Sequence, residues 1–155
     1  MHFTIALLKG DGIGPEIADE ALRVLQAVGG RFGHEFAFVE TYAGGEAWER
    51  FGEHLPPSTI ETCRSADAIL KGPFGGPTDQ LDHPKWKGVE TTAILGLRRE
   101  FDLFMNLRPV VVYPEIVSLS PLGGQSRFRQ ASRQRRRPQW ASTRAISLPH
   151  ATMVR

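Results

Sequence analysis

A short apolar run that leads directly into a glycine-rich turn and an amphipathic stretch constrains the fold of this chain most strongly. Residues 3–8 (FTIALL) are nearly all apolar, which is typical of a parallel strand covered on both faces. The glycines of GDGIG (10–14) permit a tight turn, and Pro15 suits the first position of a helix. Apolar residues then recur at helical spacing over 17–28, and the glycine pair 29–30 predicts the helix end. This order predicts the first half of a βαβ unit.

The same alternation continues along the chain. Apolar patterning predicts strands at 35–42 and 68–70, and it predicts a β-rich segment at 103–113 whose Pro109 indicates an edge position. Helical segments are predicted around Trp48, from the proline pair 56–57, and over 91–101, and a glycine- and proline-rich loop is predicted at 71–77. Strands that alternate with helices predict an α/β fold.

Charge divides the chain near residue 122. Residues 1–122 hold 11 basic and all 17 acidic residues, whereas residues 123–155 hold eight arginines, no lysine and no acid. This arginine-rich tail (123–155) shows no helical or strand period, and its polar composition cannot bury enough surface to offset chain entropy. We therefore expect one α/β unit over 1–122 and a disordered tail.

Several protein classes are excluded by composition. A single cysteine, Cys63, rules out an internal disulfide, and neither the cysteine nor the five histidines show metal-ligand spacing. No apolar run is long enough to span a bilayer, and the first eight residues do not resemble a secretory leader, so we expect a cytoplasmic protein. The GDGIG turn matches neither GxGxxG nor GxxxxGK[ST], which favours a structural turn over a phosphate cradle.

Three strings together carry a specific likeness. LLKGDGIGPEI (7–17), ADAILKGPFGGP (66–77) and LRREFDLFMNLRP (97–109) occur in the order seen in the isopropylmalate and isocitrate dehydrogenases. The chain resembles the N-terminal third of these β-decarboxylating dehydrogenases from residue 1 to about 122. The resemblance implies an isopropylmalate dehydrogenase-like α/β fold, present here as an incomplete first domain.

The resemblance also implies an activity. Family members are homodimers that use NAD or NADP and Mg²⁺ or Mn²⁺ to oxidise a 2-hydroxy acid at C2 and release the C3 carboxylate as CO₂. The expected substrate is 3-isopropylmalate. Tartrate, D-malate, isocitrate and homoisocitrate are the alternatives within the family, and a non-catalytic fragment with a nucleic-acid-binding tail is the alternative outside it.

Two arginines match the family residues that bind the malate-type carboxylates. They are Arg98, in the predicted helix, and Arg108, in the NLRP string. A planar guanidinium offers paired donors to a carboxylate, which a lysine cannot do. The neighbouring Arg99 would compete for this role, but the register of the family string favours Arg98, and a solvated surface charge is the alternative for either residue.

Four further residues fall at family contact positions. Thr92 matches a position near the nicotinamide and the substrate, and a helix-entry threonine is the alternative. Ile94 and Leu95 match positions that contact the C3 substituent, where apolar side chains suit an isopropyl group better than a carboxylate; helix core residues are the alternative. Ile13 matches a position near the adenine end of the cofactor.

The likeness ends before the family's catalytic residues. The chain has no tyrosine after Tyr113, no lysine after Lys87 and no acid after Glu115, so we assign no catalytic and no metal-binding residue and expect the chain to be inactive. Arginine without lysine in the tail indicates translation out of frame. A nucleic-acid-binding arm is the less favoured alternative, because such arms normally use both basic residues.

Overall fold

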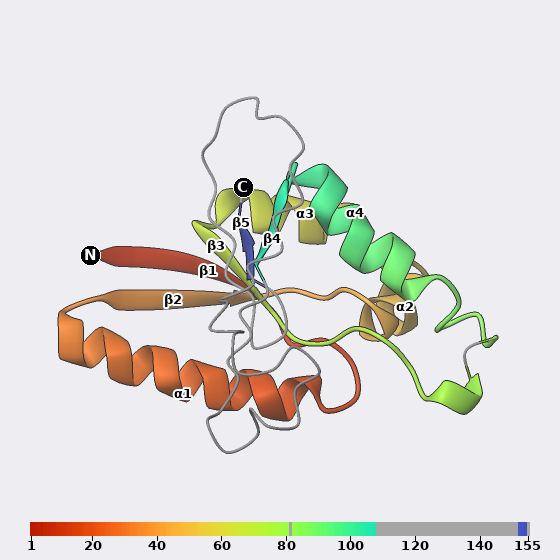
Figure 1. Ribbon diagram of the computed structural model, residues 1–155, viewed down its shortest axis with the longest axis horizontal. Helices are drawn as coiled ribbons and strands as arrows, with labels where there is room; N and C mark the ends of the chain where they lie inside the picture. The colour runs from red at the N-terminus through yellow and green to blue at the C-terminus, as the bar shows by residue number, and fades with distance from the viewer. Residues whose placement is uncertain (81, 108–151, 155) are drawn as a thin grey trace, which may run out of the picture.

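A three-stranded parallel sheet forms the centre of the computed structural model, which describes residues 1–80, 82–107 and 152–154 (Figure 1). The strands lie in the order β2 (Glu35–Glu40), β1 (His2–Leu8) and β3 (Ala68–Lys71). Both neighbours run parallel to β1, with Ile5 opposite Phe38 on one side and Ala68 on the other. The predicted βαβ arrangement and all three predicted strands are confirmed.

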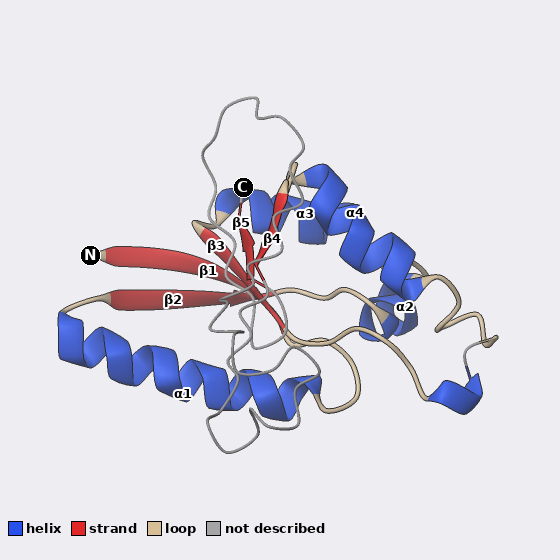
Figure 2. Cartoon of the chain, viewed as in Figure 1, coloured by secondary structure: helices blue, strands red, loops and turns tan. Residues whose placement is uncertain are grey.

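Helix α1 (Gly14–Phe32) covers one face of this sheet (Figure 2). Alternate residues of a strand point to opposite faces, and Ile5 and Leu7 of β1 pack on this side with Leu70 of β3 against Ala18 and Ala21 of the helix. The near-continuous apolar run in β1 is therefore explained, because its other residues face a second apolar layer.

The second layer is formed by α3 (Pro57–Ser65) and α4 (Leu95–Glu100). Alternate β1 residues Ala6 and Leu8 belong to this core, which also contains Cys63 of α3 and Leu97 of α4. The order of these helices agrees with the predicted proline-led helix and with the predicted helix over 91–101. No helix in the described ranges is long and apolar enough to cross a membrane.

The remaining elements lie outside the central sheet. They are the short helix α2 (Gly45–Phe51), a 3₁₀ turn η1 (Thr78–Gln80), a π-turn η2 (Glu90–Ile94), and the antiparallel pair β4 (Met105–Leu107) and β5 (Thr152–Val154). Within the tail, the backbone of residues 152–154 pairs with β4, and the disorder expected of the tail stays a prediction. The rest of the tail and residues 108–113 lie outside the described residues.

Helix α1 does not end at its glycine pair as predicted. It continues to Phe32 and ends at Gly33, which has a left-handed φ of 68° and donates its backbone N–H to the carbonyl oxygen of Gly29. A Cβ on Gly29 would lie 2.6 Å from the carbonyl oxygen of His34 and 3.2 Å from the Phe36 ring, whereas one on Gly30 meets nothing within 4 Å. Gly29 thus permits close packing against the β2 entry and does not stop the helix.

This difference predicts opposite effects for two neighbouring substitutions. Gly30→Ala should raise the free energy of unfolding by about 0.5–1 kcal/mol, because alanine is the better helix former and the site is open. Gly29→Ala should lower it, because the added methyl group overlaps backbone. Urea unfolding of both variants measures the difference, and destabilisation by Gly30→Ala would contradict this assignment.

Burial also predicts the reactivity of Cys63. Cys63 is a residue of α3 whose thiol lies in the core, and burial raises the pKa of this thiol to about 12. Because alkylation requires the thiolate, the folded chain should react with iodoacetamide at least about a hundredfold more slowly than the urea-unfolded chain near pH 8.5. Equal rates in the two states would show that the thiol is accessible.

Candidate functional site

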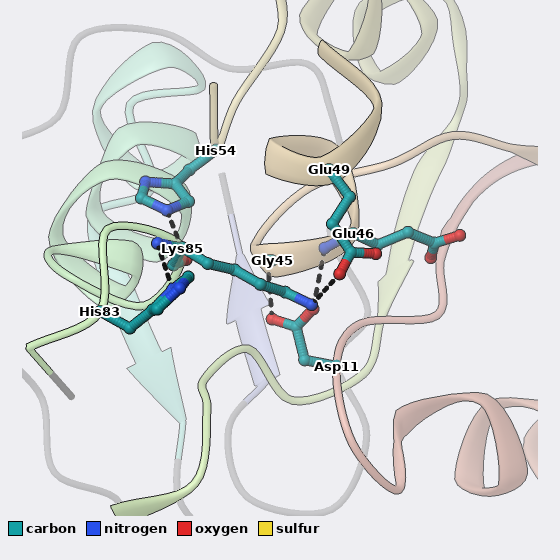
Figure 3. Close-up of polar contacts among 7 residues, drawn as sticks. All are labelled: Asp11, Gly45, Glu46, Glu49, His54, His83 and Lys85. Carbon is teal, nitrogen blue, oxygen red and sulfur yellow. Dashed lines mark hydrogen bonds and ion pairs between the residues drawn. The ribbon is translucent and has the colours of Figure 1, made fainter. Parts of the chain in front are cut away.

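Asp11 is a buried carboxylate that ties three segments together at the carboxyl end of the sheet (Figure 3). Its Oδ2 accepts hydrogen bonds from the backbone N–H groups of Gly45 (3.0 Å) and Gly75 (3.1 Å), and its Oδ1 accepts one from Glu46 (3.1 Å). Its own N–H donates to the carbonyl oxygen of Pro73 (2.8 Å). The β1–α1 turn, the start of α2 and the loop after β3 are therefore hydrogen-bonded to one carboxylate. We call this arrangement the Asp11 joint.

Glycines make this joint possible, because they have no side chain where the β1–α1 turn and the loop after β3 touch. A Cβ on Gly10, whose φ is +83°, would overlap the carbonyl oxygen of Pro73, and a Cβ on Gly14 or Gly72 would overlap that of Lys9. The GDGIG turn and the glycine-rich loop at 71–77 are therefore packed backbone against backbone.

The same geometry disfavours a phosphate cradle at the start of α1. Pro15 has no N–H to offer, the N–H of Gly14 already donates to the Asp11 carbonyl oxygen (2.9 Å), and Glu16 adds negative charge to the first turn. The turn is thus a packing element, in agreement with the structural interpretation of its sequence. Both carboxylate oxygens of Asp11 likewise accept hydrogen bonds from backbone N–H groups.

Residues 83–88 (HPKWKG) are anchored against this joint. The Trp86 ring occupies the space that a Cβ on Gly45 or Gly76 would need. The side chain of Lys85 forms an ion pair with Glu49 of α2. The backbone carbonyl oxygen of Lys85 accepts a hydrogen bond from His54 Nε2 (2.9 Å; Figure 3). Trp86 therefore anchors the loop against α2 and the loop after β3.

The anchored loop leads directly into η2 and α4, which carry most of the candidate contact residues. Thr92 is exposed, Leu95 is 45% exposed, and Arg98 is half-buried in the last turn of α4. Ile94 packs against the core cluster, so the helix-core alternative describes it better. The sequence pattern does not predict the π-turn, which lies where Thr92 and Ile94 occur.

Two other candidates lie apart from this segment. Ile13 caps the start of α1 and is 64% exposed, so its side chain is free to contact a ligand. Arg108 follows β4 directly and lies outside the described residues. The structure therefore brings Thr92, Leu95 and Arg98 together on one helical segment and leaves Ile13 on a different turn.

Lys71 is a charged residue that the sequence analysis did not single out. It ends β3, its Nζ donates to the carbonyl oxygen of Gly72 (3.2 Å), and it lies 5.1 Å from the centre of the Phe74 ring. Burial lowers the pKa of Lys71. The sequence could have indicated Lys71, because a lysine directly after a predicted buried strand lies at the carboxyl edge of the sheet, where ligands of α/β sheets bind.

The described residues provide no set of ligands for the divalent ion that the resemblance implies. Nowhere in the described ranges do three His, Cys, Asp or Glu side chains gather as a metal site. Exposed Ile13 and Thr92 fit a cofactor better, because a ring can pack on the first and a polar group can bond to the second.

Comparisons with known proteins identify the family of the chain. The sequence profile of the family described as isocitrate/isopropylmalate dehydrogenase matches residues 4–127. The 3-isopropylmalate dehydrogenase of Moorella thermoacetica is 50% identical over 121 residues, which cover 77% of this chain and 33% of that protein. The 3-isopropylmalate dehydrogenase of Aquifex aeolicus is 45% identical over 125 residues, which cover 77% of this chain and 32% of that protein. The chain thus spans about a third of these relatives' length.

Solved structures give the same result for the fold. The isocitrate dehydrogenase from Methylococcus capsulatus superimposes with a TM-score of 0.57 at 34% identity, covering 73% of this chain and 30% of that one. A β-decarboxylating dehydrogenase from Thermococcus kodakarensis gives a TM-score of 0.56 at 34% identity, with 71% and 30% covered. The predicted dehydrogenase-like α/β fold is confirmed.

The role of Asp11 can be tested with a matched pair of isosteric substitutions. Asp11→Asn should lower the free energy of unfolding by about 2 kcal/mol or more, because an amide supplies one acceptor oxygen and turns an N–H₂ group towards buried donors. Asp19→Asn removes only the exposed ion pair with Lys9 and should cost less than about 1 kcal/mol. Equal losses in urea unfolding would contradict the proposed joint.

Proposed function

Because the chain belongs to the isocitrate/isopropylmalate dehydrogenase family, we propose that it supplies the substrate-carboxylate-binding segment of a β-decarboxylating dehydrogenase. The substrate is a 2-hydroxy acid of the 3-isopropylmalate type. The reaction oxidises the C2 alcohol and releases the C3 carboxylate as CO₂. NAD or NADP takes up the hydride when it is bound.

The environment of Arg98 is the observation that carries this proposal. Its side chain is half-buried, and no carboxylate of the described residues forms an ion pair with it. The neighbouring Arg99 is exposed to solvent. A partly desolvated guanidinium without an acidic partner binds a carboxylate more strongly than a solvated one does, and its paired donors match both oxygens.

The apolar surface beside Arg98 supports the choice of substrate. Leu95, one turn earlier on α4, exposes 45% of its surface and offers no hydrogen-bond donor. An isopropyl group on C3 can pack there, whereas the additional carboxylate of isocitrate would lose water without gaining a partner. The exposed position of Leu95, in contrast to core-packed Ile94, supports Leu95 as the specificity contact.

The other family roles complete the proposal. Arg108 is the second carboxylate ligand, Thr92 contacts the nicotinamide end of the cofactor, and Ile13 contacts its adenine end. Mg²⁺ or Mn²⁺ is bound by residues that the described part of this chain does not provide. The functional unit is a homodimer, and the protein is cytoplasmic.

Turnover needs groups that the chain does not supply. Removal of the alcohol proton requires a base, and the carbanion left by CO₂ loss requires a stabilising charge. The sequence has no tyrosine after Tyr113, no lysine after Lys87 and no acid after Glu115 to fill the family's later roles. We therefore propose that the 155-residue chain binds hydroxy acids without oxidising them.

Two arginine variants test this function. In isothermal titration of the 155-residue chain, Arg98→Ala should weaken binding of 3-isopropylmalate at least about tenfold, because a charge-assisted hydrogen-bond pair is lost. Arg99→Ala is the control and should bind like the wild type.

The substrate class is tested in the same titration with isocitrate, tartrate and D-malate. Binding of isocitrate more tightly than 3-isopropylmalate would reject the specificity role of Leu95. Equal losses for both arginine variants, or reduction of NAD by the chain alone, would reject the assigned roles.

A further inference from the structure

The side chain of Lys71 lies on the face of the sheet that α3 and α4 cover. Successive residues of a strand point to opposite faces, and in β3 Ile69 belongs to the core cluster of α3 and α4 whereas Leu70 belongs to that of α1. Lys71 therefore points the same way as Ile69. Its register partner in β1 is Leu8, which lies in the same cluster as Ile69. Figure 1 shows α1 on the other side of the sheet.

This face also carries the candidate carboxylate-binding segment. Lys71 ends β3, so it lies at the carboxyl edge of the sheet, where ligands of α/β sheets bind. Its Nζ lies 5.1 Å from the centre of the Phe74 ring. Phe74 belongs to the same core cluster as Leu97, which directly precedes Arg98 in α4. Lys71 and Arg98 are therefore placed beside one core cluster, on one face of the sheet.

The ammonium group of Lys71 has unused hydrogen-bonding capacity. The side chain is half-buried, and its Nζ makes one hydrogen bond, to the carbonyl oxygen of Gly72 (3.2 Å). Within residues 1–80, 82–107 and 152–154, no carboxylate forms an ion pair with it. Burial alone lowers the pKa of Lys71. Because an ammonium has three donors, two of them remain for a ligand.

Charged groups of the surrounding elements are already engaged with one another. The carboxylate of Asp11 accepts three backbone N–H groups, and the thiol of Cys63 stays protonated because burial raises its pKa to about 12. The ion pairs around this edge are Lys9 with Asp19 of α1, and Arg64 of α3 with Glu100 of α4. None of these acids is available to neutralise Lys71.

A lysine in this place lowers the stability of the fold. Burial disfavours the charged form of an amine, and near neutral pH Lys71 is charged. A neutral side chain of similar length would pack on Phe74 without this cost. Local costs of this kind are expected at functional sites, so the ammonium is better explained by a ligand than by packing.

We propose that Lys71 is a third cationic contact of the hydroxy-acid site, where its ammonium binds a substrate carboxylate together with Arg98. This inference rests on the proposed function of that site. With Arg108, the site then offers three cations to the two carboxylates of 3-isopropylmalate. An ammonium is a compact charge with rotatable donors, so it can reach an oxygen that a planar guanidinium leaves free.

The test is Lys71→Met in the full 155-residue chain, with Lys87→Met as the matched control. Lys87 is exposed, so both variants lose one positive charge but only the first changes the proposed site. In isothermal titration Lys71→Met should weaken binding of 3-isopropylmalate at least about tenfold, because a charge-assisted hydrogen bond is lost. Lys87→Met should bind like the wild type. The Tm of Lys71→Met should equal or exceed that of the wild type.

The pH dependence of binding gives a second readout. Because burial lowers the pKa of Lys71, its ammonium loses its proton at a lower pH than an exposed lysine, which titrates near about 10.4. The affinity of the wild type should therefore fall as the pH rises from about 7.5 to about 10, while the arginines stay charged. In Lys71→Met this fall should be much smaller.

Each contrary result has a distinct meaning. Unchanged affinity in Lys71→Met, with a loss in Arg98→Ala, would overturn this inference and leave the proposed function standing. A clearly lower Tm would overturn it by showing that packing needs the lysine. Weaker binding of NAD in place of 3-isopropylmalate would overturn it by assigning the ammonium to a cofactor phosphate. A wild-type chain that binds none of the hydroxy acids would overturn the proposed function and the ligand role of Lys71 with it.

Discussion

One buried carboxylate, that of Asp11, holds three segments of this structure together at the carboxyl end of the sheet. Asp11 accepts three backbone N–H groups from two other segments, and these segments can approach only because glycine occupies the contact points. A buried carboxylate is tolerable when its oxygens are hydrogen-bonded in this way. The joint positions Phe74, which belongs to the same core cluster as Val89 and Leu97, and Trp86, whose ring lies against Gly45. The placement of η2 and α4 follows from these contacts.

This arrangement separates two roles that a glycine-rich turn after a strand can combine. In nucleotide-binding folds such a turn both shapes the backbone and binds phosphate. Here Pro15 and Glu16 make the helix start unsuitable for an anion, so the turn is architectural. We propose that carboxylate binding belongs instead to the segment from Thr92 to Arg98, which follows the loop that packs against the Asp11 joint.

Strong, local sequence patterns predict much of this fold. The strands, the proline-led helix and the glycine loop lie within a few residues of their predicted positions, because apolar period and backbone punctuation determine them. Two errors have a common cause in tertiary packing. Gly29 is required by its contact with His34 and Phe36 and not as a helix stop. The π-turn accompanies buried residues that are spaced four apart, and the sequence alone does not show that they share one core; they are Val89, Ala93, Leu97 and Phe101. The pattern does not single out Lys71, because the predicted strand ends at residue 70 and Lys71 falls in the predicted loop, whereas β3 extends to Lys71.

The most direct test of the Asp11 joint is native-state amide hydrogen exchange of Gly45, Glu46 and Gly75, followed by NMR. If one carboxylate holds all three N–H groups, they should be protected and should share one opening free energy, because a single event exposes them together. Unprotected amides, or three unrelated exchange rates typical of separate loops, would contradict the account. In that case the position of η2 and α4 would depend on other contacts.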